Sequence, residues 1–103
     1  ARMLPRNGMS MKLKNLQQYQ QNMMGAKDLF ARLRAQFTTA QAEEIESFLQ
    51  AGDPKLALEF TVDAIVENDT PLTVATFKLA EELSRAMDSD RGIDYIRKLI
   101  NAG

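Results

Sequence analysis

Cysteine, histidine and tryptophan are absent from the 103 residues, and the chain holds only three prolines and five glycines. Without cysteine there are no disulfides, thiolate nucleophiles or zinc–sulfur sites. Without histidine the chain lacks the commonest general base and metal ligand in proteins. Most enzyme mechanisms therefore lose a component, and no pattern pairs the remaining carboxylates, lysines and hydroxyls. The composition favours a binding protein that uses no cofactor or metal over an enzyme.

The chain also lacks a long hydrophobic run. No stretch approaches the roughly 18 to 20 apolar residues that cross a bilayer, and no secretory signal is recognisable. We therefore expect a cytoplasmic protein that does not enter membranes. At this length one hydrophobic core is possible and two are not. Residues 1–10 show no sustained period, so we expect a disordered N-terminal extension or an expression remnant there, and a single helical domain over residues 11–103.

Charge is divided unevenly along the chain, although the net charge is only −1. Residues 1–36 hold seven basic side chains and one acidic side chain, whereas residues 37–103 hold six basic and thirteen acidic ones. The acidic excess is densest over residues 43–69, where eight acidic residues accompany only Lys55. Such a division bears on binding partners rather than on the fold.

Apolar residues recur at spacings of three and four along most of the chain, which predicts helices. Thr38 and Gln41 have the spacing of a capping box, and Gly52 is the expected stop of the helix that they begin. The predicted fold is a small antiparallel all-α bundle of five or six helices. The expected helices cover residues 11–24, 26–37, 39–51, 54–68, 71–87 and 93–100, and the first two could form one bent helix.

Two of these helices are expected to begin at a proline, in the pairs Asp53-Pro54 and Thr70-Pro71, where the first residue caps the helix. In the first of them, apolar and other residues alternate over residues 56–62, which is a strand pattern. Helix is still preferred, because Ala, Leu and Glu are strong helix formers and the apolar set continues out of alternation. This helix should be central, since apolar residues cover most of its circumference.

The first two predicted helices each have an apolar stripe that we expect to face the core. Aromatic and methionine side chains on or near these stripes are interpreted as packing residues rather than as stacking platforms for bases. The stripe residues are Leu13, Leu16, Tyr19 and Met23 in the first helix and Leu29, Phe30, Leu33 and Phe37 in the second, with Met24 beside them.

Acidic side chains occupy the narrow polar face of the central helix. Glu59, Asp63 and Glu67 lie four residues apart, so they stack one above another. Like charges at this spacing cost roughly 0.2 to 0.5 kcal/mol per pair in an isolated helix. Either basic groups of a neighbouring helix relieve the repulsion, or the row is an acidic patch that binds a basic ligand. Glu43, Glu44, Glu46 and Asp53 could extend such a patch across the Gly52 turn, and Asp69 follows the row. Acidic residues at a helix start are also explained by compensation of the helix dipole, which is the favoured interpretation there.

A metal site is not expected in the chain. Asp88-Ser89-Asp90 is similar to the start of a calcium loop, but no glutamate or other ligand follows at the required offsets. No glycine-rich phosphate cradle is present either.

The stretch IESFLQAGDPKLALEFTVDAIVENDTPLT, residues 45–73, followed by LSRAMDSD at residues 83–90, resembles the MafI-type immunity proteins of bacterial polymorphic toxin systems, including contact-dependent growth inhibition. The resemblance lies in the order of a helix, a glycine turn, a LALE helix, an acidic exit, a proline-led helix and a methionine near its end. It covers roughly residues 37–90, about half of the chain. The resemblance implies a protein that neutralises a cognate toxin, often a nuclease.

The resemblance and the charge pattern lead to one hypothesis. Because a nuclease needs a basic cleft, clustered carboxylates can imitate its nucleic acid. The expected toxin-binding residues are Glu43, Glu46, Glu59, Asp63, Glu67 and Asp69. The partner would be a cognate bacterial toxin domain, in the favoured case a basic nuclease.

Other functions remain open at this stage. A small helical nucleic-acid-binding regulator or antitoxin would use the basic N-terminal segment on phosphates. The acidic helix after Gly52 disfavours it, because a recognition helix exposes basic and polar side chains. An adaptor that docks on a partner helix is a third class, and the first helix could pair with its own copy.

Overall fold

The computed structural model describes residues 6–101, and within this range all regular structure is helical, as predicted. The helices are joined by short loops, and no strand is formed by the described residues. The elements are α1 (Arg6–Leu33), the 3₁₀ turn η1 (Arg34–Gln36), α2 (Thr39–Gln50), α3 (Pro54–Asn68), α4 (Val74–Ala86) and α5 (Ile93–Arg97).

Side-chain caps fix the starts of α2 and α3, and a glycine ends α2. The Thr38 hydroxyl accepts a hydrogen bond from the Gln41 amide at 3.1 Å, and the Gln41 side chain accepts one from the Thr38 amide at 2.9 Å. This capping box confirms the predicted start of α2. Gly52 has a φ of 77°, which glycine adopts without steric cost, so it ends α2 as predicted. The Asp53 carboxylate then caps α3 by accepting from the Leu56 amide.

The predicted start of α4 at Thr70-Pro71 is wrong, because α4 begins at Val74 and its cap is Thr73. The Leu72 amide donates to the Leu99 carbonyl at 2.9 Å, and the Leu72 carbonyl accepts from the Asn101 amide at 2.7 Å. These bonds make a parallel bridge to the C-terminal segment. They hold the backbone out of helical geometry up to Thr73.

The two helices predicted on either side of Gly25 are one helix. α1 runs through this glycine and begins at Arg6, five residues before the expected start. The predicted disorder over residues 1–10 is therefore wrong for residues 6–10, which are helical. Residues 1–5 of that prediction lie outside the described residues. Gly25 marks a close approach of α1 to α4, where Leu83 occupies the space that a Cβ atom would take.

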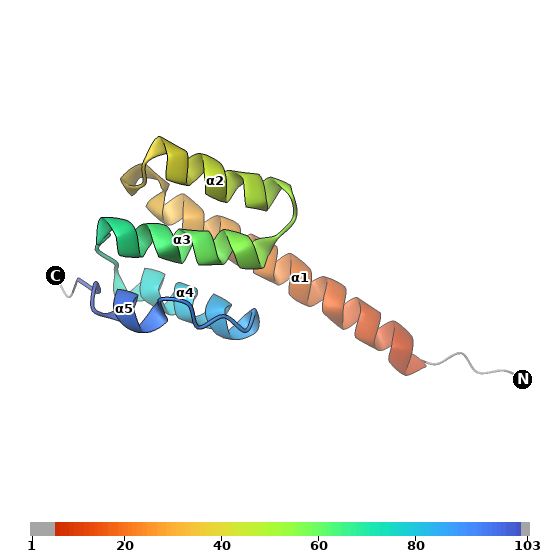
Figure 1. Cartoon of the computed structure of the whole chain (residues 1–103). Coiled ribbons are helices and arrows are strands. Elements are labelled where there is room, and N and C mark those ends of the chain that lie inside the picture. The colour runs from red at the N-terminus through yellow and green to blue at the C-terminus, as the bar shows by residue number, and fades with distance from the viewer. Residues whose placement is uncertain (1–5, 102–103) are drawn as a thin grey trace, which may run out of the picture.

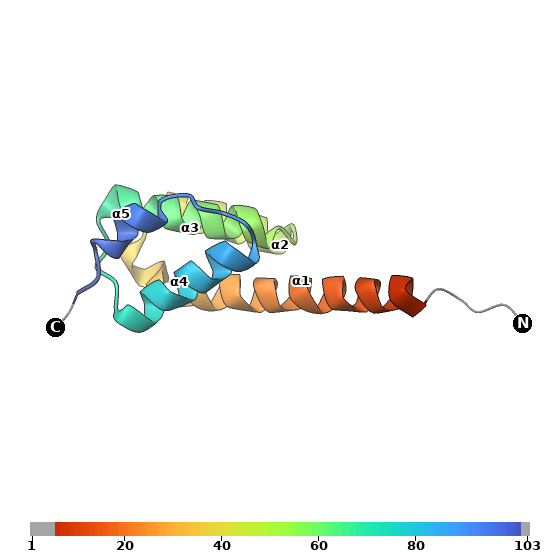
Figure 2. The same cartoon turned by 90° about the horizontal axis from the view of Figure 1, so that it is seen from below.

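α3 lies at the centre of the bundle and contacts α1, α2, α4 and α5, as its largely apolar circumference predicted (Figure 1). α2 and α3 run antiparallel on one side of α1, and α4 crosses on another side (Figure 2). The N-terminal half of α1 extends well beyond the other helices. This overhang makes the described part of the molecule elongated.

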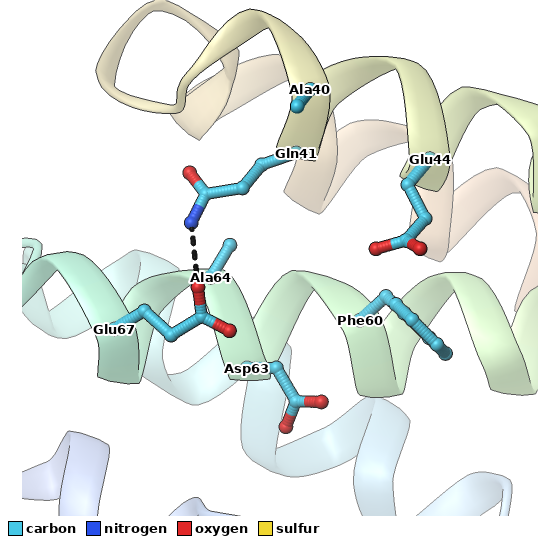
Figure 3. A pocket seen from close by; sticks show the side chains of 7 residues that line it. All are labelled: Ala40, Gln41, Glu44, Phe60, Asp63, Ala64 and Glu67. Carbon is cyan, nitrogen blue, oxygen red and sulfur yellow. Dashed lines mark hydrogen bonds between the residues drawn. The ribbon is translucent and has the colours of Figure 1, made fainter.

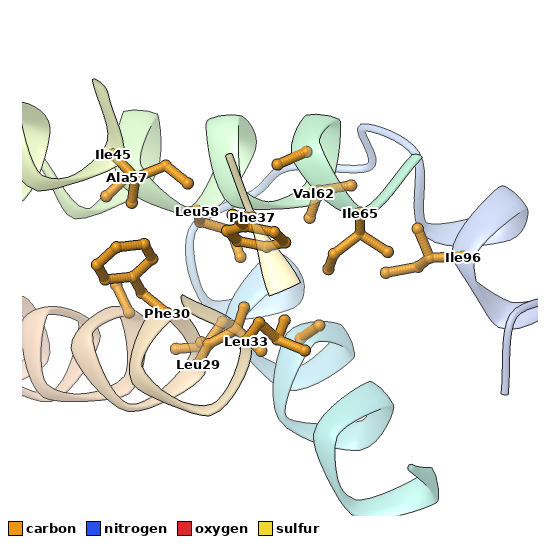
Figure 4. Packing of buried hydrophobic residues seen from close by; sticks show 14 of the residues in the cluster. Leu29, Phe30, Leu33, Phe37, Ile45, Ala57, Leu58, Val62, Ile65 and Ile96 are labelled. Carbon is orange, nitrogen blue, oxygen red and sulfur yellow. The ribbon is translucent and has the colours of Figure 1, made fainter. Parts of the chain in front are cut away.

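The core is apolar and joins all five α-helices (Figure 4). Phe30 and Phe37 are buried in it, as predicted, with ring centroids 6.4 Å apart. Side chains from α1, α2, α3 and α5 meet at the centre of the cluster. The most completely buried large residues are Leu29, Ile45, Leu58, Ile65, Leu72 and Ile96.

The predicted core role of the first stripe of α1 is wrong. Leu13, Leu16, Tyr19 and Met24 are 59%, 52%, 42% and 71% exposed, and only Met23 is half-buried. The spacing correctly indicated an amphipathic helix, but no other described helix packs on this half of α1.

The contact between Gly25 and Leu83 can be tested by a double-mutant cycle. Gly25→Ala gains helix propensity worth about 1 kcal/mol, but its methyl group displaces the buried Leu83 side chain. We expect a net destabilisation of about 1 to 2 kcal/mol in urea unfolding. In a Leu83→Ala background the same substitution should stabilise, because the obstacle is gone. A destabilisation of equal size in both backgrounds would contradict the close approach.

Candidate functional site

The acidic row of α3 forms as predicted, on consecutive turns of the helix, but each carboxylate has a partner. Glu59 accepts a hydrogen bond from the Ser89 hydroxyl at 2.9 Å. Asp63 accepts two from the Arg91 guanidinium, at 3.0 and 2.8 Å. Of the three, only Asp63 pairs with a cation among the described residues, because the partner of Glu67 is the neutral Gln41.

The loop between α4 and α5 supplies these two partners because it lies close against α3. Gly92 has a φ of 74°, and a Cβ atom there would be 2.7 Å from Val62 Cγ1. A side chain at this position would push the loop away from α3. The close backbone approach brings Ser89 and Arg91 within reach of the carboxylates. Since Arg91 and Asp63 are both partly exposed, their pair contributes at most about 1 kcal/mol to stability.

The remaining member of the row, Glu67, faces α2 across a shallow groove of about 220 Å³. Gln41 donates to Glu67 at 3.1 Å, and Glu44 extends from α2 toward α3 (Figure 3). Asp63 and Phe60 form part of the opposite wall. We call this feature the α2–α3 groove. It is lined by Ala40, Gln41, Glu44, Phe60, Asp63, Ala64 and Glu67. The carboxylates of Glu44 and Glu67 lie on the groove, whereas the Asp63 side chain points away from α2 and pairs with Arg91.

A polar network closes the end of the α2–α3 groove. The Asn68 side chain donates to the Gln41 side-chain oxygen at 2.8 Å, and Gln41 donates back to Asn68 at 3.2 Å. The same Gln41 oxygen also accepts from the Thr38 amide in the capping box. The start of α2 is thereby tied to the end of α3, which fixes the width of the groove at this end.

The other predicted residues do not join this surface. Glu43 is exposed and lines a second, open depression with Arg34 and Phe37, on the side of α2 that faces α1. Glu46 lies toward the same side and pairs with Arg34 at 2.7 Å. Asp69, in left-handed conformation at the end of α3, accepts a hydrogen bond from the Tyr95 hydroxyl at 2.7 Å. The six residues are thus spread over at least three places.

The surface nevertheless keeps a large negative charge. Among the described side chains, those of residues 13–101, the carboxylates of Glu43 and Glu44 make no hydrogen bond or ion pair. Glu59, Glu67 and Asp69 have only neutral partners, namely Ser89, Gln41 and Tyr95. Among the described residues, therefore, only two of these seven carboxylates form ion pairs: Glu46 pairs with Arg34, and Asp63 pairs with Arg91.

Sequence reasoning missed Gln41 and Glu44 as groove residues. Gln41 was interpreted only as a capping residue, and Glu44 was left out of the expected binding set. Their spacing of three places both on one face of α2, but the sequence does not show which face of α2 meets α3. That pairing is set by the core contacts of Ile45 and Leu58.

Two kinds of function find no support in the described residues. No three acidic side chains there lie in an arrangement that could hold a metal ion. No helix in the same range is long and apolar enough to cross a membrane. Comparison with known proteins gives no family assignment, because no family model, curated protein or solved structure matches the chain.

The pair of Tyr95 and Asp69 gives a measurable pKa. The hydrogen bond to Asp69 and the negative charge of that carboxylate raise the pKa of the Tyr95 phenol above 10.0. We expect Asp69→Asn to bring this pKa back toward 10.0, measured from phenolate absorbance in a Tyr19→Phe background that leaves one tyrosine.

The sign of the linked stability follows from the raised value. The contribution of the pair to folding stability should be fully present below pH 10.0 and be lost as the pH rises through the higher pKa of the folded state. An identical tyrosine titration in the Asp69→Asn variant would contradict the contact.

Proposed function

We propose that the chain is an immunity protein that binds and neutralises a cognate bacterial toxin domain in the cytoplasm, in the favoured case a basic nuclease. The observation that carries the proposal is the α2–α3 groove, which carries the carboxylates of Glu44 and Glu67 from two different helices. The sequence resemblance to MafI-type immunity proteins supports it independently.

The α2–α3 groove suits a basic side chain of a partner. A lysine or arginine could place its charged group between the carboxylates of Glu44 and Glu67. Its aliphatic stem could lie on Phe60, which is half-buried and packs against Phe48 with ring centroids 4.7 Å apart. Among the described residues, the Glu44 carboxylate has no partner that an incoming cation would have to displace. Gln41 can remain hydrogen-bonded to Glu67 through its amide while the second carboxylate oxygen binds the incoming cation.

The unpaired carboxylates would mainly act on the rate of encounter. A surface with one dominant sign of charge raises the association rate with an oppositely charged partner, and salt screens this effect. A nuclease offers such a partner, because its cleft must attract phosphates. If the basic cleft of the toxin binds this acidic surface, the chain competes with the nucleic-acid substrate for the cleft.

The fold disfavours the alternative of a nucleic-acid-binding regulator. In a helix-turn-helix the recognition helix would be α3, which follows the Gly52 turn. However, α3 is covered by other helices, and its exposed side chains include carboxylates. Arg32 and Arg34 in the basic segment pair with Asp28 and Glu46. Fewer cations are therefore free to bind phosphates than the sequence alone indicated.

The proposal predicts that a toxin domain is encoded immediately upstream of this chain, and the test uses that domain. We expect the two proteins to co-purify and the chain to protect cells that express the toxin. In the double variant Glu44→Gln/Glu67→Gln the association rate at low ionic strength should fall about tenfold, because two groove charges are lost. Stopped-flow mixing over a salt series measures this rate.

A variant with the same net charge serves as the control. Glu82→Gln/Asp94→Asn removes two carboxylates that lie on α4 and α5 and do not line the groove. It should leave the association rate within about twofold of the original. Equal effects of the two double variants would remove the groove from the mechanism, and the absence of any complex would refute the immunity function.

A further inference from the structure

We propose that the overhang of α1 pairs antiparallel with the overhang of a second copy of this chain. The overhang is the part of α1 before Tyr19, whose hydroxyl donates to the Gly52 carbonyl at 2.9 Å. N-terminal to this contact, α1 extends away from the other helices (Figures 1 and 2). This inference does not rest on the proposed function.

The overhang has an apolar side on which no other described helix of its own chain lies. Leu13 and Leu16 are more than half exposed and lie on the same side of the helix as the partly buried Met23. The positions 13, 16, 20 and 23 alternate in spacing between three and four, which is the spacing of a two-helix seam, with Gln20 as its one polar member.

A helix of this composition needs a partner. The overhang spans residues 6–18 and continues the packed part of α1, so its nucleation costs nothing extra. In proteins most helix stability comes from tertiary packing, and no other described helix lies against this part of α1. Its sequence includes Asn7, Gly8, Ser10 and Asn15, which are weak helix formers or favour turns. Burial of Leu13 and Leu16 against another helix would supply the missing stabilisation.

Charge favours a second copy in antiparallel orientation. Residues 6–27 hold the basic residues Arg6, Lys12, Lys14 and Lys27 and no acidic residue, whereas residues 37–103 carry an excess of seven negative charges. An antiparallel pair directs each basic overhang toward the acidic helices of the other copy. A parallel pair would instead place like charges side by side.

A pairing centred at Leu16 satisfies the apolar side chains. Leu16 then meets Leu16 of the second copy, and Leu13 lies opposite Tyr19. Lys14 lies opposite Gln18, so no lysine faces a lysine in the seam. The two copies would contribute identical surfaces, as in a two-fold symmetric dimer.

Sedimentation of the full chain up to about 200 µM tests the pairing, in the range where weak dimers dissociate. We expect a dimer whose dissociation constant rises at least tenfold in Leu16→Glu and also rises with salt. Gln21→Glu adds the same charge on the other side of α1 and should dimerise like the original chain. Helix content and thermal unfolding verify that Leu16→Glu, outside the core, leaves the bundle intact.

Cross-linking reads the orientation, since the chain has no cysteine of its own. Leu16→Cys should form a disulfide-linked dimer on oxidation. Leu13→Cys should not, because antiparallel pairing separates its two copies by six residues, about 9 Å along the axis. Disulfide formation at both positions would indicate parallel pairing and overturn the proposal.

Other outcomes also decide the matter. A chain that stays monomeric over the whole concentration range, or equal weakening by Leu16→Glu and Gln21→Glu, would overturn the pairing. If the chain stays monomeric and Leu16→Glu weakens toxin binding instead, the apolar side of the overhang is part of the toxin interface and the pairing is wrong. The groove variants at Glu44 and Glu67 lie outside the overhang, so the two proposals fail separately.

Discussion

Burial of α3 is the constraint on which the rest of the structure depends. Leu58 and Ile65 are almost inaccessible because helices cover α3 from several directions. Only a narrow strip of its circumference reaches solvent, and this strip carries Glu59, Asp63 and Glu67. On such a helix, carboxylates are accommodated only in this strip. The free-energy cost of burying an unpaired carboxylate is far greater than the cost of repulsion between exposed carboxylates one turn apart. The acidic row is therefore a consequence of how completely the helix is enclosed.

Much of the fold could be predicted because its determinants are local. The Thr38–Gln41 box, the Gly52 stop and the Asp53-Pro54 start each act within a few residues. Thr70-Pro71 has the same local pattern and still begins no helix. The bonds from Leu72 to Leu99 and Asn101 override it, and they join segments almost thirty residues apart. A pattern read from neighbouring residues does not contain such a contact.

The candidate site was less predictable for the same reason. The row on α3 follows from helical spacing alone, but the groove requires knowledge of which side of α2 lies against it. Gln41 and Glu44 enter the site only through that packing. The apolar stripe at Leu13 and Leu16 shows the converse: its period is helical, but period does not reveal whether a core helix, a second molecule or solvent lies against it.

The glycine at position 92 has a consequence for the charge of the whole acidic face. Its backbone touches Val62, and this contact holds Ser89 and Arg91 over Glu59 and Asp63. A single methyl group at that position would lift the segment and uncover both carboxylates at once. The steric fit between Gly92 and Val62 thus determines the negative charge exposed on this face, although neither residue is charged.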